Sequence, residues 1–181
     1  NLSEDFERVS GKRAPVINTP NNDRIIVVGT LDSRFIKALS DKKRLDTKQL
    51  EGKNEKYIIT VVSKPFDGVD EALVIVGSDK RGAIYGIYEL SEQIGVSPWY
   101  DWADVPVIRQ ENLSIAKGVY TAGEPAVKYR GIFLNDEAPA LTTWVYNTYG
   151  TNYGDHRFYS RVFELILRLR GNFLWPAMWD W

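Results

Sequence analysis

The last third of the chain constrains its fold more tightly than any other segment. Residues 131–134 form an apolar run that stops at Asn135, and residues 172–175 form a second apolar run that stops at Pro176. Between them, residues 158–170 carry apolar side chains at the spacing of an amphipathic helix. The pattern predicts a strand, a polar loop, a helix and a second strand. This order is the repeating unit of parallel α/β folds, including the (β/α)8 barrel.

Upstream of this unit, short apolar runs predict a separate α/β sheet. They are short and rich in β-branched side chains, which is typical of buried strands, and they cover residues 24–28, 56–62 and 73–77. Apolar side chains at helical spacing predict helices at residues 2–9, 35–39 and 80–94, with residues 45–50 as a further candidate. The predicted fold class of the chain is therefore α/β.

The segment Gly77–Gly82 lies between a predicted strand and a predicted helix, as phosphate-binding loops do. It lacks the Gly-Lys-Ser/Thr and Gly-x-Gly-x-x-Gly patterns of those loops. Ser78 or Asp79 at this place is a good helix N-cap, and Gly82 and Gly86 allow close packing of helix on sheet. A cap is therefore favoured over a phosphate site. The helix itself should bury the apolar residues at helical spacing, Ala83, Ile87, Leu90 and Ile94.

Residues 98–127 contain three prolines and are expected to connect two parts of the protein. The one strand-like piece in this stretch is residues 105–108. The predicted division is an N-terminal α/β domain at residues 1–110, a connector at residues 111–127, and an incomplete barrel that begins at residues 128–181. Since the first residue is Asn1 and not Met, the chain is expected to be a segment of a longer protein.

Composition excludes several classes of protein. The formal net charge is −1, so the chain lacks the basic face that nucleic-acid binding requires. Cysteine is absent and His156 is the one histidine, which argues against disulfide frameworks and zinc sites. No apolar run reaches the roughly 18 residues of a membrane span. Neither a metal, a cofactor, a nucleic acid nor a membrane is therefore expected as a partner.

Aromatic residues make up 13% of the chain, including six Trp and ten Tyr. Flat rings stack on the apolar faces of sugars, so a surplus of this kind fits a carbohydrate cleft. The same rings can equally fill a core and its edges. Composition leaves both interpretations open.

Three contiguous stretches resemble glycoside hydrolase family 115. They are residues 72–100 together with Trp102-Ala-Asp-Val-Pro106, then residues 128–140, and finally residues 171–179. The resemblance implies a xylan α-1,2-glucuronidase, an inverting enzyme that removes glucuronic acid or its 4-O-methyl ether from xylan. It also implies a small α/β domain followed by a (β/α)8 barrel, of which this chain would hold the first β-α-β segment. Xylan or glucuronoxylan is the implied partner and an extracellular or periplasmic location the implied compartment. The segment alone is expected to be inactive.

Candidate site residues follow the two strands of this segment, because barrel enzymes place their chemistry at the carboxyl ends of the strands. Glu137 is the candidate acid, base or sugar-hydroxyl acceptor, although a solvated loop residue fits the sequence too. Asn135 and Asp136 beside it, and Trp175 and Trp179 after the second strand, are the candidate sugar-binding residues. Turn formation and packing under a barrel rim are the alternatives for these residues.

A glucuronate carboxylate also calls for a cation, ideally an arginine. Arg81 is the candidate, with Arg130 as a second, whereas Arg161, Arg168 and Arg170 are expected on the solvated face of their helix. The helix should also expose an apolar patch made of Phe163, Leu165, Ile166 and Leu169.

The main alternative function is a non-catalytic carbohydrate-binding or accessory module built on the same residues. A nucleotide-binding domain that uses residues 78–82 is a more distant alternative.

Overall fold

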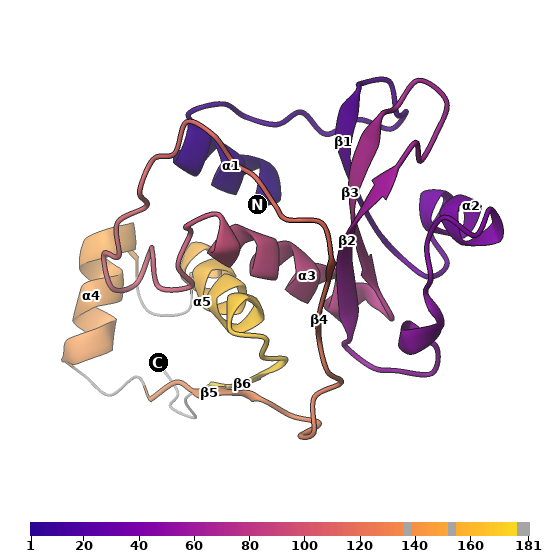
Figure 1. The fold of residues 1–181 in the computed structure, drawn as a ribbon. Coiled ribbons are helices and arrows are strands. Elements are labelled where there is room, and N and C mark those ends of the chain that lie inside the picture. Colours follow the sequence, from indigo (N-terminus) through magenta and orange to yellow (C-terminus); the bar gives the residue numbers. More distant parts are fainter. Residues whose placement is uncertain (136–138, 152–154, 177–181) are drawn as a thin grey trace.

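The structure is a computed structural model that describes residues 1–135, 139–151 and 155–176. It has two parts that pack side by side, a four-stranded sheet with helices on both faces and a two-stranded parallel ribbon with two helices (Figure 1). None of the described helices has the length and apolar character needed to cross a membrane.

The sheet has the strand order β1-β3-β2-β4. Its strands are β1 (Arg24–Thr30), β2 (Tyr57–Ser63), β3 (Glu71–Gly77) and β4 (Val119–Ala122). β1 runs parallel to β3, whereas β2 is antiparallel to both β3 and β4. The three strands predicted from apolar runs are confirmed as β1, β2 and β3.

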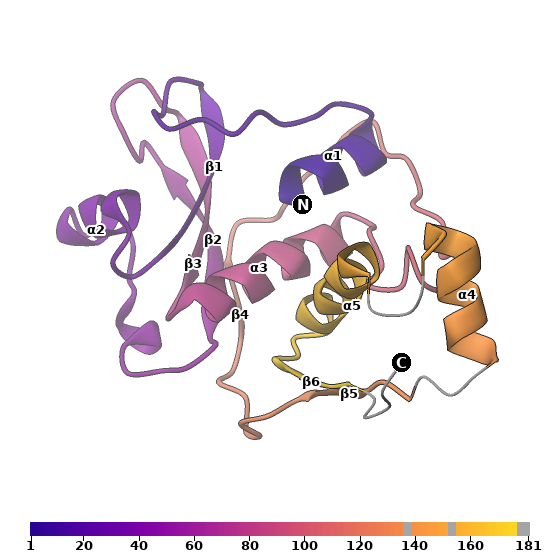
Figure 2. The ribbon, with the colours of Figure 1, turned by 180° about the vertical axis from the view of Figure 1, so that it is seen from behind.

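Alternating side chains of the sheet form two cores, one on each face. On one face, Ile58 and Val74 pack with α2 (Arg34–Asp41) and the short 3-10 helix η1 (Lys48–Leu50). On the other face, Ile59 and Ile75 pack with α1 (Leu2–Ser10) and α3 (Lys80–Gln93). Figure 2 shows α2 on one side of the strands and α1 and α3 on the other.

Helix α3 lies close to the sheet at Gly86. A Cβ added there would lie 2.6 Å from Ile75 Cγ2, so a larger residue would push the helix away from the sheet. The predicted apolar face of α3 is only partly correct. Ile87 is half-buried, whereas Tyr85 and Tyr88 are buried in its place because α1 and α5 also cover this helix.

The connector differs from its prediction. Residues 105–108 form no strand, and Pro106 lacks the N–H donor that a strand ladder needs. Instead β4, inside the predicted connector, adds an edge strand through the pairing of Tyr57 with Ala122. Most of β4 is exposed, so it has no alternating apolar pattern by which it could be recognised.

The ribbon pairs β5 (Gly131–Phe133) in parallel with β6 (Phe173–Trp175). Two helices connect these strands, α4 (Ala140–Tyr149) and α5 (His156–Arg168). The two strands and α5 were predicted, and α4 was not. Only Val145 of α4 is buried, and the helix contains Thr, Val, Trp and Tyr, which have modest helix propensity.

Helix α5 buries more of its apolar face than expected. Leu165 and Ile166 are 6% and 5% exposed, so the predicted apolar patch is wrong for these two residues. Phe163 and Leu169 remain 50% and 41% exposed, as predicted. Ile166 packs with Val145, Phe158 and Val162 in a third core beneath the ribbon.

Candidate functional site

The carboxyl ends of β5 and β6 lie side by side. Phe133 is paired with Trp175, and the backbone N–H of Leu134 donates to the carbonyl oxygen of Trp175 at 2.8 Å. The rings of Phe133 and Trp175 meet edge to face with centroids 5.7 Å apart. Asn135 follows Leu134 directly and is exposed. Asn135 and Trp175 therefore lie at the same end of the two paired strands.

The ribbon turns one face toward its helices and the other toward solvent. Ile132, Leu134 and Leu174 pack against the third core. On the outer face the aromatic side chains are exposed and form two ring pairs, Tyr129 with Phe173 at 5.9 Å and Phe133 with Trp175 at 5.7 Å. This row of rings supplies flat apolar surfaces of the kind that stack on sugars.

Three other predicted site residues, Asp136, Glu137 and Trp179, lie outside the residues that the structure describes. By sequence, Asp136 and Glu137 follow Asn135 at the end of β5, and Trp179 follows the end of β6. Their roles remain predictions.

The amino ends of the same strands are held by a single carboxylate, that of Glu55. Its Oε2 accepts a hydrogen bond from Arg130 Nη2 at 2.6 Å, and its Oε1 accepts one from Asn172 Nδ2 at 2.9 Å. Arg130 and Asn172 directly precede β5 and β6. The loop before β2 therefore holds the amino ends of the two strands, opposite the ends at Asn135 and Trp175.

Arg81 belongs to the held end. Its Nη1 donates to Glu55 Oε1 at 2.8 Å. The structure thus does not bring Arg81 together with Asn135 and Trp175, which lie at the other end of the strands. Arg130, the second candidate cation, is engaged in the same way with Glu55 and with the carbonyl oxygens of Val127 and Arg170.

The carboxylate of Glu55 is largely shielded from solvent, with a side chain that is 10% exposed. Burial opposes its ionised form, but the hydrogen bonds from Arg81, Asn172 and Arg130 outweigh burial and hold the pKa of Glu55 below its ordinary value. The carboxylate therefore stays ionised, which is the state that binds two guanidinium groups.

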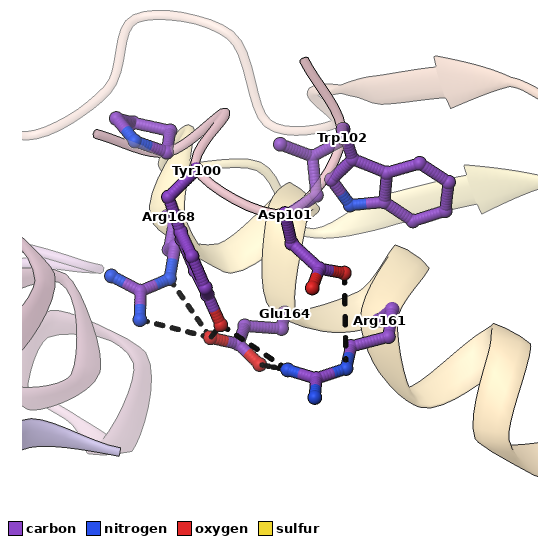
Figure 3. A pocket seen from close by; sticks show the side chains of 8 residues that line it. Tyr100, Asp101, Trp102, Arg161, Glu164 and Arg168 are labelled. Carbon is purple, nitrogen blue, oxygen red and sulfur yellow. Dashed lines mark hydrogen bonds and ion pairs between the residues drawn. The ribbon is translucent and has the colours of Figure 1, made fainter. Parts of the chain in front are cut away.

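A second polar cluster joins α5 to the rest of the chain, and here the sequence prediction for Arg168 is wrong. Arg168 is 4% exposed instead of solvated. Figure 3 shows it beside Tyr100 and Glu164, and its Nε donates to Glu164 Oε1 at 2.9 Å. Arg161 lies at the edge of the cluster, 3.8 Å from Asp101. Arg168 is buried because the fold brings Asp5 of α1 against it, with Arg168 Nη2 donating to Asp5 Oδ2 at 2.8 Å. Asp5 is distant in sequence, so local patterns could not predict this contact.

The loop before α3 is a helix cap, as predicted. Asp79 Oδ1 accepts from the Gly82 N–H at 2.8 Å, and Asp79 Oδ2 accepts from the Glu55 N–H at 2.9 Å. A carboxylate of the chain thus occupies the Gly82 N–H, a backbone donor that a phosphate in this loop would use. Among the described residues, no group of three or more His, Asp or Glu side chains is arranged to hold a metal ion.

Two family models match different parts of the chain. The family model of glycosyl hydrolase family 115 matches residues 122–181, and the model of the glycosyl hydrolase family 67 N-terminus matches residues 1–90. A solved structure described as a family GH115 4-O-methyl-α-glucuronidase, BtGH115A, with specificity for decorated arabinogalactans is 37% identical, with a TM-score of 0.80. The similarity covers 98% of this chain and 22% of that one. No curated protein matches the chain.

Proposed function

Because the chain belongs to glycosyl hydrolase family 115, we propose that it contributes to the hydrolytic release of α-linked glucuronic acid, or its 4-O-methyl ether, from a polysaccharide. The observation that carries the proposal is the shared carboxyl end of β5 and β6. Asn135 follows β5 there and the exposed ring of Trp175 ends β6, within the segment that the family model matches.

In the proposed architecture, β5 and β6 are the first two strands of a (β/α)8 barrel. Three features support this: the strands are parallel, helices connect them, and their outer face is apolar and exposed. Residues 128–181 then begin the barrel. The sheet of residues 1–110, extended by β4, forms a domain that supports the amino ends of the barrel strands.

In the proposed site, Trp175 and Trp179 provide stacking surfaces and Asn135 binds a sugar hydroxyl. Glu137, with Asp136 beside it, supplies a carboxyl group as acid, base or hydroxyl acceptor. Inversion requires a second carboxyl group roughly 6.5–9.5 Å away, with water between the two. In a barrel, that group comes from the end of another strand.

Xylan is the substrate that the family resemblance favours, and an arabinogalactan is the alternative that the similar solved enzyme favours. Both carry uronic acid side groups, so the proposed reaction is the same for either polymer. Since both are polymers found outside cells, we place the reaction outside the cytoplasm, in an extracellular or periplasmic location.

The test uses the full-length enzyme that contains this chain. Glucuronic acid release from glucuronoxylan and from decorated arabinogalactan is measured for the parent, Trp175→Ala and Asn135→Ala. Tyr129→Ala is the control, because Tyr129 is also an exposed ring on the same face but lies at the amino end of the ribbon. We expect the Trp175 and Asn135 variants to lose activity and the control to keep it. Full activity in both would contradict the proposal.

The non-catalytic alternative predicts a different result. If the protein is a carbohydrate-binding module, its migration through a gel that contains glucuronoxylan should be slowed, and Trp175→Ala should abolish the effect. The full-length protein would then release no uronic acid from either polymer.

A further inference from the structure

The carboxylate of Glu55 binds side chains from three separate segments of the chain. Glu55 lies in the loop before β2 and accepts hydrogen bonds from Arg81 on α3, Arg130 before β5 and Asn172 before β6. Its side chain is only 10% exposed, although the residue belongs to a loop. This burial indicates that the contact is part of the packed structure and not a surface ion pair.

The backbone of Glu55 is also constrained. Its φ angle is +54°, in the left-handed region that residues other than glycine rarely adopt. The N–H of Glu55 is held by Asp79 Oδ2, the same carboxylate that caps α3. The loop is thus anchored to α3, and the Glu55 side chain is presented to the ribbon from a fixed base.

The two donors from the ribbon bind each other as well as Glu55. The Arg130 N–H donates to Asn172 Oδ1 at 3.0 Å, and the Asn172 N–H donates to the Arg130 carbonyl oxygen at 2.7 Å. Arg130 Nε and Nη2 also donate to the carbonyl oxygen of Arg170. The residues that precede the two strands, Arg130 and Asn172, are therefore hydrogen-bonded to each other and to the carboxylate of Glu55.

We propose that Glu55 is a positioning residue that sets the place of the carboxyl ends of β5 and β6, and with them Asn135 and Trp175. Each strand is three residues long, so its two ends are only about 7 Å apart. A displacement at the amino end is therefore carried to the carboxyl end. Only the consequence for catalysis rests on the proposed function.

The first experiment measures hydrogen–deuterium exchange in the full-length enzyme that contains this chain, comparing the parent with Glu55→Gln and Glu55→Ala. The glutamine variant keeps the shape of the side chain and loses the charge that binds Arg81 and Arg130. We expect exchange to accelerate roughly tenfold in the β5 and β6 peptides, including the Leu134 amide, while β2 and β3 keep their protection. Glu111→Gln, which removes an exposed carboxylate elsewhere, should leave every peptide unchanged.

The second experiment follows the indole N–H signal of Trp175 by NMR, assigned with Trp175→Phe. A displaced strand end should shift this signal in Glu55→Gln, whereas the indole signal of Trp102 in the α4–α5 core should stay in place. Unchanged exchange and an unchanged Trp175 signal would overturn the proposal. Accelerated exchange spread evenly over all elements would also overturn it, because Glu55 would then contribute only to global stability.

Activity of the full-length enzyme separates the two proposals. If Trp175 shifts and glucuronic acid release falls, both are supported. If Trp175 shifts and release is unchanged, Glu55 remains a positioning residue but the strand ends are not the site of reaction.

Discussion

Arg168 and Asp5 form a buried ion pair across 163 positions of sequence. Arg168 Nη2 lies 3.0 Å from Oδ1 and 2.8 Å from Oδ2 of Asp5, and their side chains are 2% and 0% exposed. The rings of Tyr88 and Tyr100 cover the guanidinium group with centroids at 4.5 Å and 5.0 Å. The pair ties α1 to α5 and thereby fastens the ribbon and its helices to the sheet.

Removing one partner of this pair should be costly. Arg168→Met leaves the buried Asp5 carboxylate with Arg8 alone as its cation, and we expect the free energy of unfolding to fall by up to about 3–5 kcal/mol. The measurement is urea unfolding followed by circular dichroism. Arg13→Met is the control, because Arg13 pairs with Glu4 at an exposed site where a loss under about 1 kcal/mol is expected. Equal losses in the two variants would contradict a special role for the buried pair.

Gly131 should tolerate no side chain. A Cβ at this position would lie 1.7 Å from the carbonyl oxygen of Phe173, so Gly131→Ala has to separate β5 from β6. We expect a loss of about 1–3 kcal/mol in urea unfolding, as for other overpacked sites. Gly123→Ala is the matched control, since no atom lies within 4 Å of its added Cβ. A neutral Gly131→Ala variant would show that the strands are less closely paired than described.

The lowered pKa of Glu55 predicts that the free energy of unfolding depends on pH. Its pKa is lowered in the folded chain, so its contribution is present above the ordinary value of 4.5 and is lost as the pH falls through the lower folded pKa. The difference in urea midpoint between the parent and Glu55→Gln should therefore be largest near neutral pH and shrink as the pH falls below 4.5. A difference that stays constant over this range would mean that the charge of Glu55 contributes nothing.

Glu137 yields a prediction from sequence for the full-length enzyme. Glu137→Gln keeps the shape of the side chain and removes its ionisable group, so a role in acid–base chemistry predicts a loss of about 10²-fold or more in kcat. The folded state should change little, which thermal unfolding can verify. Near-normal turnover on glucuronoxylan and arabinogalactan would assign Glu137 to the loop structure alone.

Local patterns in the sequence were sufficient for most of the helices and strands. The apolar runs predicted β1, β2 and β3, because a strand buried in a sheet needs little beyond its own β-branched residues to be recognised. Asp79 was predictable as a cap, since a helix N-terminus needs an acceptor within a few residues. Asn135 and Trp175 were predicted to share a strand end because parallel strands align their carboxyl ends.

The arrangement of side chains that are distant in sequence was decided only by the tertiary structure. Arg168 has the sequence context of a solvated helix residue, and it is buried because α1 brings Asp5 against it. Arg81 binds Glu55 and does not lie at the carboxyl ends of β5 and β6, because folding places the loop of Glu55 beside α3. β4 is a strand because β2 offers it a free edge. Hydrophobic periodicity is a local property, whereas ion pairs and edge pairing depend on which segments meet after folding.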